Sequence, residues 1–145
     1  MIHMAGVLNA TKVRENWGQF NDDIVRQGPQ FVKRHRDSWA AFSAEHLKVA
    51  FAPFVFKATF TQEEDKSYTV TLDGFDLVEN GTTREEAMEL ITEELIEYAT
   101  EYQNEFNVFF NAPNRREHFP YVMNVLIQDN KKDVKDLIKC PVGER

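Results

Sequence analysis

The sequence contains a single cysteine, Cys140, among its 145 residues. A disulfide framework needs cysteine pairs, so we do not expect a disulfide-stabilised secreted domain. The sequence also lacks an apolar run long enough to cross a bilayer, and its start shows no basic region followed by an apolar run, as signal peptides have. These features predict a cytoplasmic protein that does not use a membrane.

Glycine is scarce too, and the six glycines are spread singly, so no phosphate-binding glycine loop supports nucleotide-dependent chemistry. The four histidines lie in different segments without ligand spacing; they are His3, His35, His46 and His118. We therefore expect no metal and no cofactor. Asp73, Asp76 and Glu79 follow a predicted strand, as the magnesium ligands of a nuclease would, but they fit a polar turn equally well. With no second acidic or histidine motif beside them, the sequence predicts no enzyme.

Basic residues are fewer than acidic ones. The sequence has 17 lysines and arginines and 24 aspartates and glutamates, which gives a net charge of −7. The imbalance is uneven along the chain. Residues 1–50 carry seven basic and five acidic side chains, a net of +2, and the remainder carries −9. An asymmetry of this kind indicates a different partner for each half, although so small a difference also arises by chance.

The sequence does contain alternating helical and strand patterns, with 42% apolar residues. A chain of this length can bury a core without a metal or a disulfide. Pro53 disfavours helix in the residue before it, and the pattern after it changes to strands. We therefore expect an α+β protein with two units, residues 1–52 and 53–145.

The first unit is expected to begin with a short strand at Val7 and Leu8 and a helix from Thr11 to Gln27. One face of this helix is apolar, through Val13, Trp17, Phe20 and Ile24. Thr11 is expected to cap the first turn of the helix, and Gly28 and Pro29 supply a helix stop. A hairpin over residues 30–43, with a polar turn at residues 35–38, and a short helix opened by Ser43 complete the predicted unit.

Four short motifs stand out in the first unit: Ala10-Thr-Lys-Val-Arg14, Gly28-Pro29, Lys33-Arg-His-Arg36 and Ser43-Ala-Glu45. Through the order and spacing of these motifs, the unit resembles the Phd/YefM family of antitoxins. The resemblance implies a dimer that binds operator DNA, with contacts from Arg14, Lys33, Arg34 and Arg36. The family's usual turn contains Arg-Gly-Lys, whereas the turn here, His35-Arg-Asp-Ser38, has no glycine and includes an acid.

The second unit is expected to contain three strands, a long helix and a fourth strand. The predicted strands are residues 54–60, 67–72 and 75–81. A capping box at Thr83 and Glu86 begins the helix, whose apolar face continues to Phe109. Residues 121–127 are predicted to form the last strand, and residues 129–138 a charged tail with one or two helical turns.

The second unit contains two informative motifs, Asp65-Lys-Ser-Tyr68 and, above all, Gly81-Thr-Thr-Arg-Glu-Glu-Ala87. Through them it is similar to HicB-like antitoxin domains. The similarity implies a βββαβ, partial RNase H-like unit that has no nuclease centre and binds a toxin. Many HicB proteins add a C-terminal DNA-binding module, but about eighteen residues after Ile127 are too few for one. The first unit would supply that role.

An acidic stripe follows the long helix at steps of four residues; it consists of Glu89, Glu93, Glu97, Glu101 and Glu105. Like charges at this spacing repel one another. The stripe either keeps the protein soluble or forms a surface that is complementary to a basic ribonuclease toxin. In the second case Glu93, Glu97 and Glu101 are the candidate partner-binding residues.

Taken together, the two resemblances imply an antitoxin that neutralises a ribonuclease-type toxin and represses its own operon. A homodimer is expected because the first unit has too little apolar surface to fold alone. The alternative is an orphan, non-catalytic protein-interaction domain that does not bind DNA.

Overall fold

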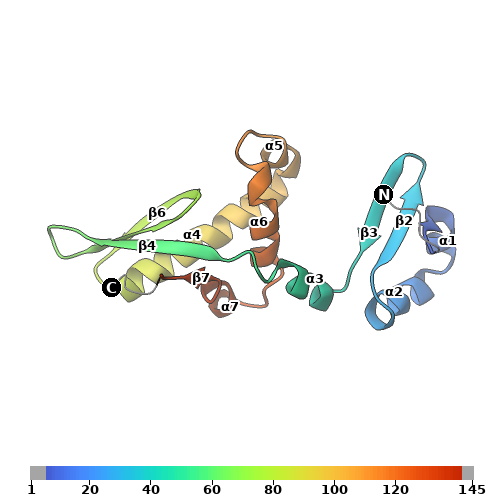
Figure 1. Cartoon of the computed structure of the whole chain (residues 1–145), viewed down its shortest axis with the longest axis horizontal. Helices are drawn as coiled ribbons and strands as arrows, with labels where there is room; N and C mark the ends of the chain where they lie inside the picture. Colours follow the sequence, from blue (N-terminus) through green and yellow to red (C-terminus); the bar gives the residue numbers. More distant parts are fainter. Residues whose placement is uncertain (1–5, 142–145) are drawn as a thin grey trace. The chain divides into compact units, whose positions relative to one another are not determined.

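The structure, a computed structural model, describes residues 6–141 of the chain (Figure 1). Helices and strands are mixed in this range, which confirms the expected α+β class. The chain divides between Ala50 and Phe51 into two compact units, called unit 1 and unit 2 below. Each unit has its own sheet and its own core.

Unit 1 contains a three-stranded sheet. In chain order its described elements are β1 (Leu8–Asn9), α1 (Ala10–Glu15), α2 (Trp17–Arg26), β2 (Gln30–Arg34), β3 (Asp37–Ala41) and α3 (Ala44–Phe51), the last residue of which begins unit 2. The central strand is β2, which is parallel to β1 and antiparallel to β3. The short first strand, the hairpin and the helix after Ser43 are therefore confirmed.

The helix expected from Thr11 to Gln27 is instead two helices that meet at Asn16, so that prediction is wrong. Asn16 has φ −122° and ψ 43°, outside the helical region. Its side-chain amide donates to the Lys12 carbonyl at 3.0 Å, a bond that competes with helix continuation. The N-terminal cap also differs from the expected Thr11, since Asn9 Oδ1 accepts a hydrogen bond from the Lys12 N–H at 2.9 Å.

Unit 1 has a small core. Val13, Phe20 and Val32 are its buried apolar side chains within residues 6–50, and Leu8, Ala10, Ile24 and Ala41 pack against them in part. Other large side chains stay exposed, with exposed fractions of 60% for Trp17, 39% for Phe31, 42% for Trp39 and 40% for Phe42. The unit thus leaves much of its own apolar surface uncovered.

Unit 2 is larger and contains a four-stranded sheet in the order β6-β5-β4-β7. Its described elements are β4 (Phe56–Gln62), β5 (Tyr68–Leu72), β6 (Phe75–Gly81), α4 (Arg84–Asn104), α5 (Phe106–Phe110), the 3-10 helix η1 (Arg116–His118), α6 (Phe119–Leu126), α7 (Lys131–Lys135) and β7 (Ile138–Lys139). The first three strands are antiparallel neighbours, as the alternation of their side chains predicts.

One face of this sheet packs against α4 (Figure 1). The buried strand residues are Phe56, Ala58, Val70, Leu72 and Leu77, and α4 buries Ala87, Ile91, Leu95, Ala99 and Tyr102 against them. As expected, Thr83 begins the helix, its Oγ1 accepting a hydrogen bond from the Glu86 N–H at 3.1 Å. A Cβ atom at Gly81 would lie 2.4 Å from the backbone nitrogen of Ala87. The close approach of β6 to α4 therefore requires glycine at position 81.

The long helix is interrupted at Glu105, where φ is −119° and ψ is 45°, and resumes as α5. The prediction of one continuous helix to Phe109 is therefore wrong. The charged tail contains α7, as expected. Asn130 caps this helix by accepting at Oδ1 from the Asp133 N–H at 2.9 Å.

The last strand expected at residues 121–127 is instead the helix α6, so this prediction is also wrong. Pro120 lies in its first turn, and the buried His118, Val122 and Val125 recur at helical steps. A short apolar run cannot be assigned to strand or helix from its composition. The fourth strand is β7, which pairs with β4 in parallel through Phe56 and Ile138.

Candidate nucleic-acid interface and partner surface

Parallel pairing of β1 with β2 brings two separate loops of unit 1 to the same edge of its sheet. Leu8 is paired with Val32, and Asn9 with Lys33. The carboxyl ends of parallel strands lie at the same edge, so the residues after Asn9 meet the residues after Lys33. The residues after Asn9 begin α1, and the residues after Lys33 lead into the turn of the hairpin.

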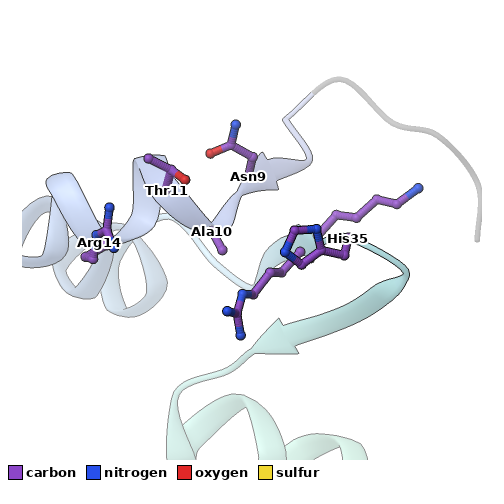
Figure 2. A pocket seen from close by; sticks show the side chains of 7 residues that line it. Asn9, Ala10, Thr11, Arg14 and His35 are labelled. Atoms are coloured by element: carbon purple, nitrogen blue, oxygen red, sulfur yellow. The ribbon is translucent and has the colours of Figure 1, made fainter.

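A cavity of about 520 Å³ lies where these segments meet, and we call it the basic cavity (Figure 2). Among the residues that the structure describes, seven line it: Asn9, Ala10, Thr11, Arg14, Lys33, Arg34 and His35. Figure 2 shows Asn9, Ala10 and Thr11 at the start of α1, with His35 across from them in the hairpin. Three of the seven residues are cationic and none is acidic.

The basic cavity brings together three of the four predicted DNA-binding residues, Arg14, Lys33 and Arg34. Arg36 is the second residue of the turn and is not part of the lining. Within residues 6–141 the three lining cations form no ion pair, and their side chains are exposed. Their charge is therefore available to an anion.

Sequence reasoning missed the contributions of Thr11 and His35 to the basic cavity. Thr11 was interpreted as a helix cap, and His35 as one of several scattered histidines. The signal in the sequence was their position. Thr11 comes shortly after β1 and His35 directly after β2, and these two strands are parallel. Using that signal requires knowing that β1 and β2 are neighbours.

The acidic stripe on α4 is divided into two parts by α7. Lys131 Nζ lies 2.8 Å from Glu89 Oε2 and 2.7 Å from Glu93 Oε1, and Lys135 Nζ lies 2.5 Å from Glu89 Oε1. Hydrogen bonds from Lys131 and then Lys135 lower the pKa of Glu89 to about 2. The first two glutamates of the stripe thus attach α7 to α4.

The other part of the stripe is open. Glu97, Glu101 and Glu105 line a shallow depression of about 490 Å³ together with Thr100 and Asn104. These three carboxylates form no ion pair with other residues in the described range. Of the predicted partner-binding residues, Glu97 and Glu101 therefore present uncompensated charge, whereas Glu93 shares Lys131 and keeps 59% of its side chain exposed.

A neighbouring glutamate on the same helix behaves differently. Burial, together with the adjacent carboxyl group of Glu79, raises the pKa of Glu94 to about 7. Glu94 is consequently partly protonated near neutral pH. Most of the negative charge on this part of α4 then comes from Glu97 and Glu101.

The buried His118 of unit 2 has both ring nitrogens in hydrogen bonds. Its Nε2 lies 2.9 Å from the carbonyl oxygen of Gly74, which only accepts, so Nε2 donates. Nδ1 therefore accepts from the Tyr98 hydroxyl at 2.7 Å, and Arg115 Nη1 donates to that hydroxyl at 3.2 Å. Burial lowers the pKa of His118, which favours this neutral form. The network ties the turn before β6 to α4 and η1.

The acids considered as magnesium ligands do not gather into a site. Asp73 lies 3.8 Å from Lys57 Nζ and accepts from the Thr59 hydroxyl at 3.1 Å, whereas Asp76 lies 3.6 Å from Arg115. No group of three or more potential metal ligands occurs in residues 6–141, a range that does not include His3. In the same range, no helix is long and apolar enough to span a membrane.

The protein thus has a basic cavity in one unit and an open acidic surface in the other. Residues 4–140 match the family model of PHD-like antitoxins, described as antitoxins of RelE/RelB toxin-antitoxin systems. Because the match spans nearly the whole sequence, the chain belongs to this antitoxin family.

A solved structure supports the same assignment. The chain is 38% identical to an antitoxin part of a proposed toxin/antitoxin system from Syntrophomonas wolfei subsp. wolfei, with a TM-score of 0.88. The alignment covers 93% of this chain and 97% of the other. No curated protein matches the sequence.

Proposed function

We propose that the protein binds operator DNA as a dimer through unit 1 and neutralises a ribonuclease-type toxin through unit 2. The observation that carries the proposal is the convergence of Arg14, Lys33 and Arg34 on the basic cavity. Contacts to the phosphate backbone need cationic side chains on one surface. Here they come from β2 and from α1, which directly follows the strand that is paired with β2. Their unpaired charge distinguishes this surface from the ion-paired lysines of α7.

The toxin-binding half of the proposal rests on the open part of the acidic stripe. Glu97 and Glu101 would face a basic toxin, with Glu93 at the border of the same surface. Opposite charge speeds the encounter of two proteins. DNA binding by unit 1 and toxin binding by unit 2 agree with our further proposal that unit 1 is a Phd/YefM-like domain and unit 2 a HicB-like domain.

Replacing Lys33 and Arg34 together with alanine is expected to weaken binding of the full chain to the DNA upstream of its gene. The loss should be similar for every DNA sequence, because phosphate contacts carry no base information. Each lost contact should also reduce the slope of log affinity against log salt by about 0.9. Fluorescence anisotropy titrations at several salt concentrations measure both effects.

Arg26 provides the matched control, since it is a cation at the end of α2 that does not line the basic cavity. Arg26→Ala should keep the wild-type salt slope. If the wild-type chain binds no upstream DNA at low salt, with or without the product of the neighbouring gene, the repressor role is wrong. Unit 2 would then be the functional part, as a protein-interaction domain.

The dimer is expected to form through exposed apolar side chains of unit 1. Phe31 lies next to the buried Val32 in β2 and so faces the opposite side of the sheet, away from the core. We expect the full chain to sediment as a dimer at micromolar concentration, and Phe31→Asp to shift it toward monomer. Val78→Asp, at an exposed position of unit 2, is the control. A folded wild-type monomer under these conditions would contradict the dimer.

A further inference from the structure

The turn of the unit 1 hairpin contains only two residues, His35 and Arg36, because Arg34 is paired directly with Asp37. The first of them, His35, lines the basic cavity together with Arg14, Lys33 and Arg34. Its imidazole is thus a fourth basic side chain on a surface that already gathers three cations. Figure 2 shows the ring on the hairpin side of this cavity.

The backbone conformation of His35 is unusual for a residue with a side chain. Its φ is 53°, in the left-handed region where glycine is favoured. In this region an ordinary side chain crowds its own backbone, and histidine tolerates it better than most. An imidazole is thus held at a position where glycine would make the same turn with less strain.

The charged groups around His35 come from each element that borders the turn. Arg14 is on α1, Lys33 and Arg34 are on β2, Arg36 follows in the turn, and Asp37 begins β3. A neutral imidazole can donate one hydrogen bond to a phosphate oxygen, whereas the protonated ring adds a full positive charge. A phosphodiester therefore binds the protonated ring more strongly, and by linkage its binding promotes proton uptake.

We propose that His35 contacts a DNA phosphodiester in the basic cavity and makes operator binding stronger as the pH falls. The inference rests on the proposed DNA-binding function of unit 1. It adds a proton-dependent contact to the three permanently charged ones. Histidine suits this role because its side chain changes charge between about pH 5 and 8.

The test compares DNA affinity of the full chain at pH 6 and pH 8, at constant ionic strength, using DNA from upstream of its gene. The wild-type chain should bind on the order of tenfold more tightly at pH 6 if two histidines per dimer each gain a phosphate contact. The salt slope should be steeper at pH 6, by about 0.9 for each such histidine. In His35→Asn the affinity ratio and the slope difference should shrink markedly, because asparagine tolerates the left-handed turn and carries no charge.

His46→Gln is the matched control, because His46 lies on α3 and does not line the basic cavity. It should keep the wild-type response to pH. His35→Gly provides a second variant that suits the positive φ, and it should behave like His35→Asn. If the wild type binds DNA but all four proteins respond equally to pH, the role of His35 is wrong and the DNA-binding function stands. If the wild type binds no DNA at either pH in low salt, both proposals are wrong.

Discussion

An alanine at position 81 is expected to lower the free energy of unfolding of unit 2 by about 3 kcal/mol or more. The added Cβ atom would lie 2.4 Å from the backbone nitrogen of Ala87 and 2.9 Å from its Cα. These are backbone atoms in the first turn of α4, so no side chain can rotate away to relieve the contact. The helix would have to move from β6, with loss of packing at Ala87 and Ile91. Urea unfolding of the full chain measures the change.

Gly18→Ala is the control for this prediction. Gly18 is an exposed residue of α2, and nothing lies within 4 Å of a Cβ atom built there. Because alanine favours helix, this variant should be more stable than the wild type by about 0.5–1 kcal/mol. A Gly81→Ala protein as stable as Gly18→Ala would contradict the close approach of β6 and α4.

The second large effect is expected from replacing Asn124 with aspartate. Asn124 is 1% exposed, and its Nδ2 donates to the Phe54 carbonyl oxygen at 2.9 Å. Aspartate has the same shape, but it places a buried negative oxygen against that carbonyl. The free energy of unfolding of unit 2 should fall by about 3 kcal/mol at pH 8, as for an uncompensated buried charge. At low pH the protonated carboxyl group can donate again, so the loss should be smaller at pH 4.5.

Asn111→Asp is the control, because it makes the same substitution at an exposed position. Asn111 also donates from Nδ2 to a backbone carbonyl, that of Asn107, at 2.7 Å, but it is exposed. Its replacement should cost less than about 1 kcal/mol, because water can solvate the new charge. Urea unfolding at pH 8 and at pH 4.5 measures the loss of stability for both variants. An equal, pH-independent loss in both variants would show that burial of Asn124 is not the cause.

Features that depend on neighbouring residues could be predicted from the sequence. The alternation of Tyr68, Val70 and Leu72 predicted a strand, and Thr83 predicted the start of α4, because side-chain direction and capping involve only a few adjacent residues. Helix continuity was harder to predict. Asn16 and Glu105 interrupt helices inside otherwise regular apolar patterns, where periodicity alone carries no sign of a break.

Features that depend on distant pairing could not be predicted. Arg14 and Arg34 were predicted together as DNA contacts from the family resemblance, but the cavity that they share depends on β1 lying parallel to β2. The pairing of Glu89 with Lys131 and Lys135 likewise joins residues that are far apart in the sequence. No local pattern in the sequence indicates which glutamates of the stripe are compensated by lysines and which remain open.

The pairing of β4 with β7 has a consequence for the order in which the chain folds during synthesis. The first strand of unit 2 can acquire its second neighbour only after residues 138 and 139 have left the ribosome. The described strands of unit 1 lie within residues 8–41, so they leave the ribosome much earlier. Domains generally fold as they emerge, N-terminal first. On a nascent chain, the described strands of the unit proposed to bind DNA are therefore available for folding and dimerisation while the unit proposed to bind toxin still lacks β7.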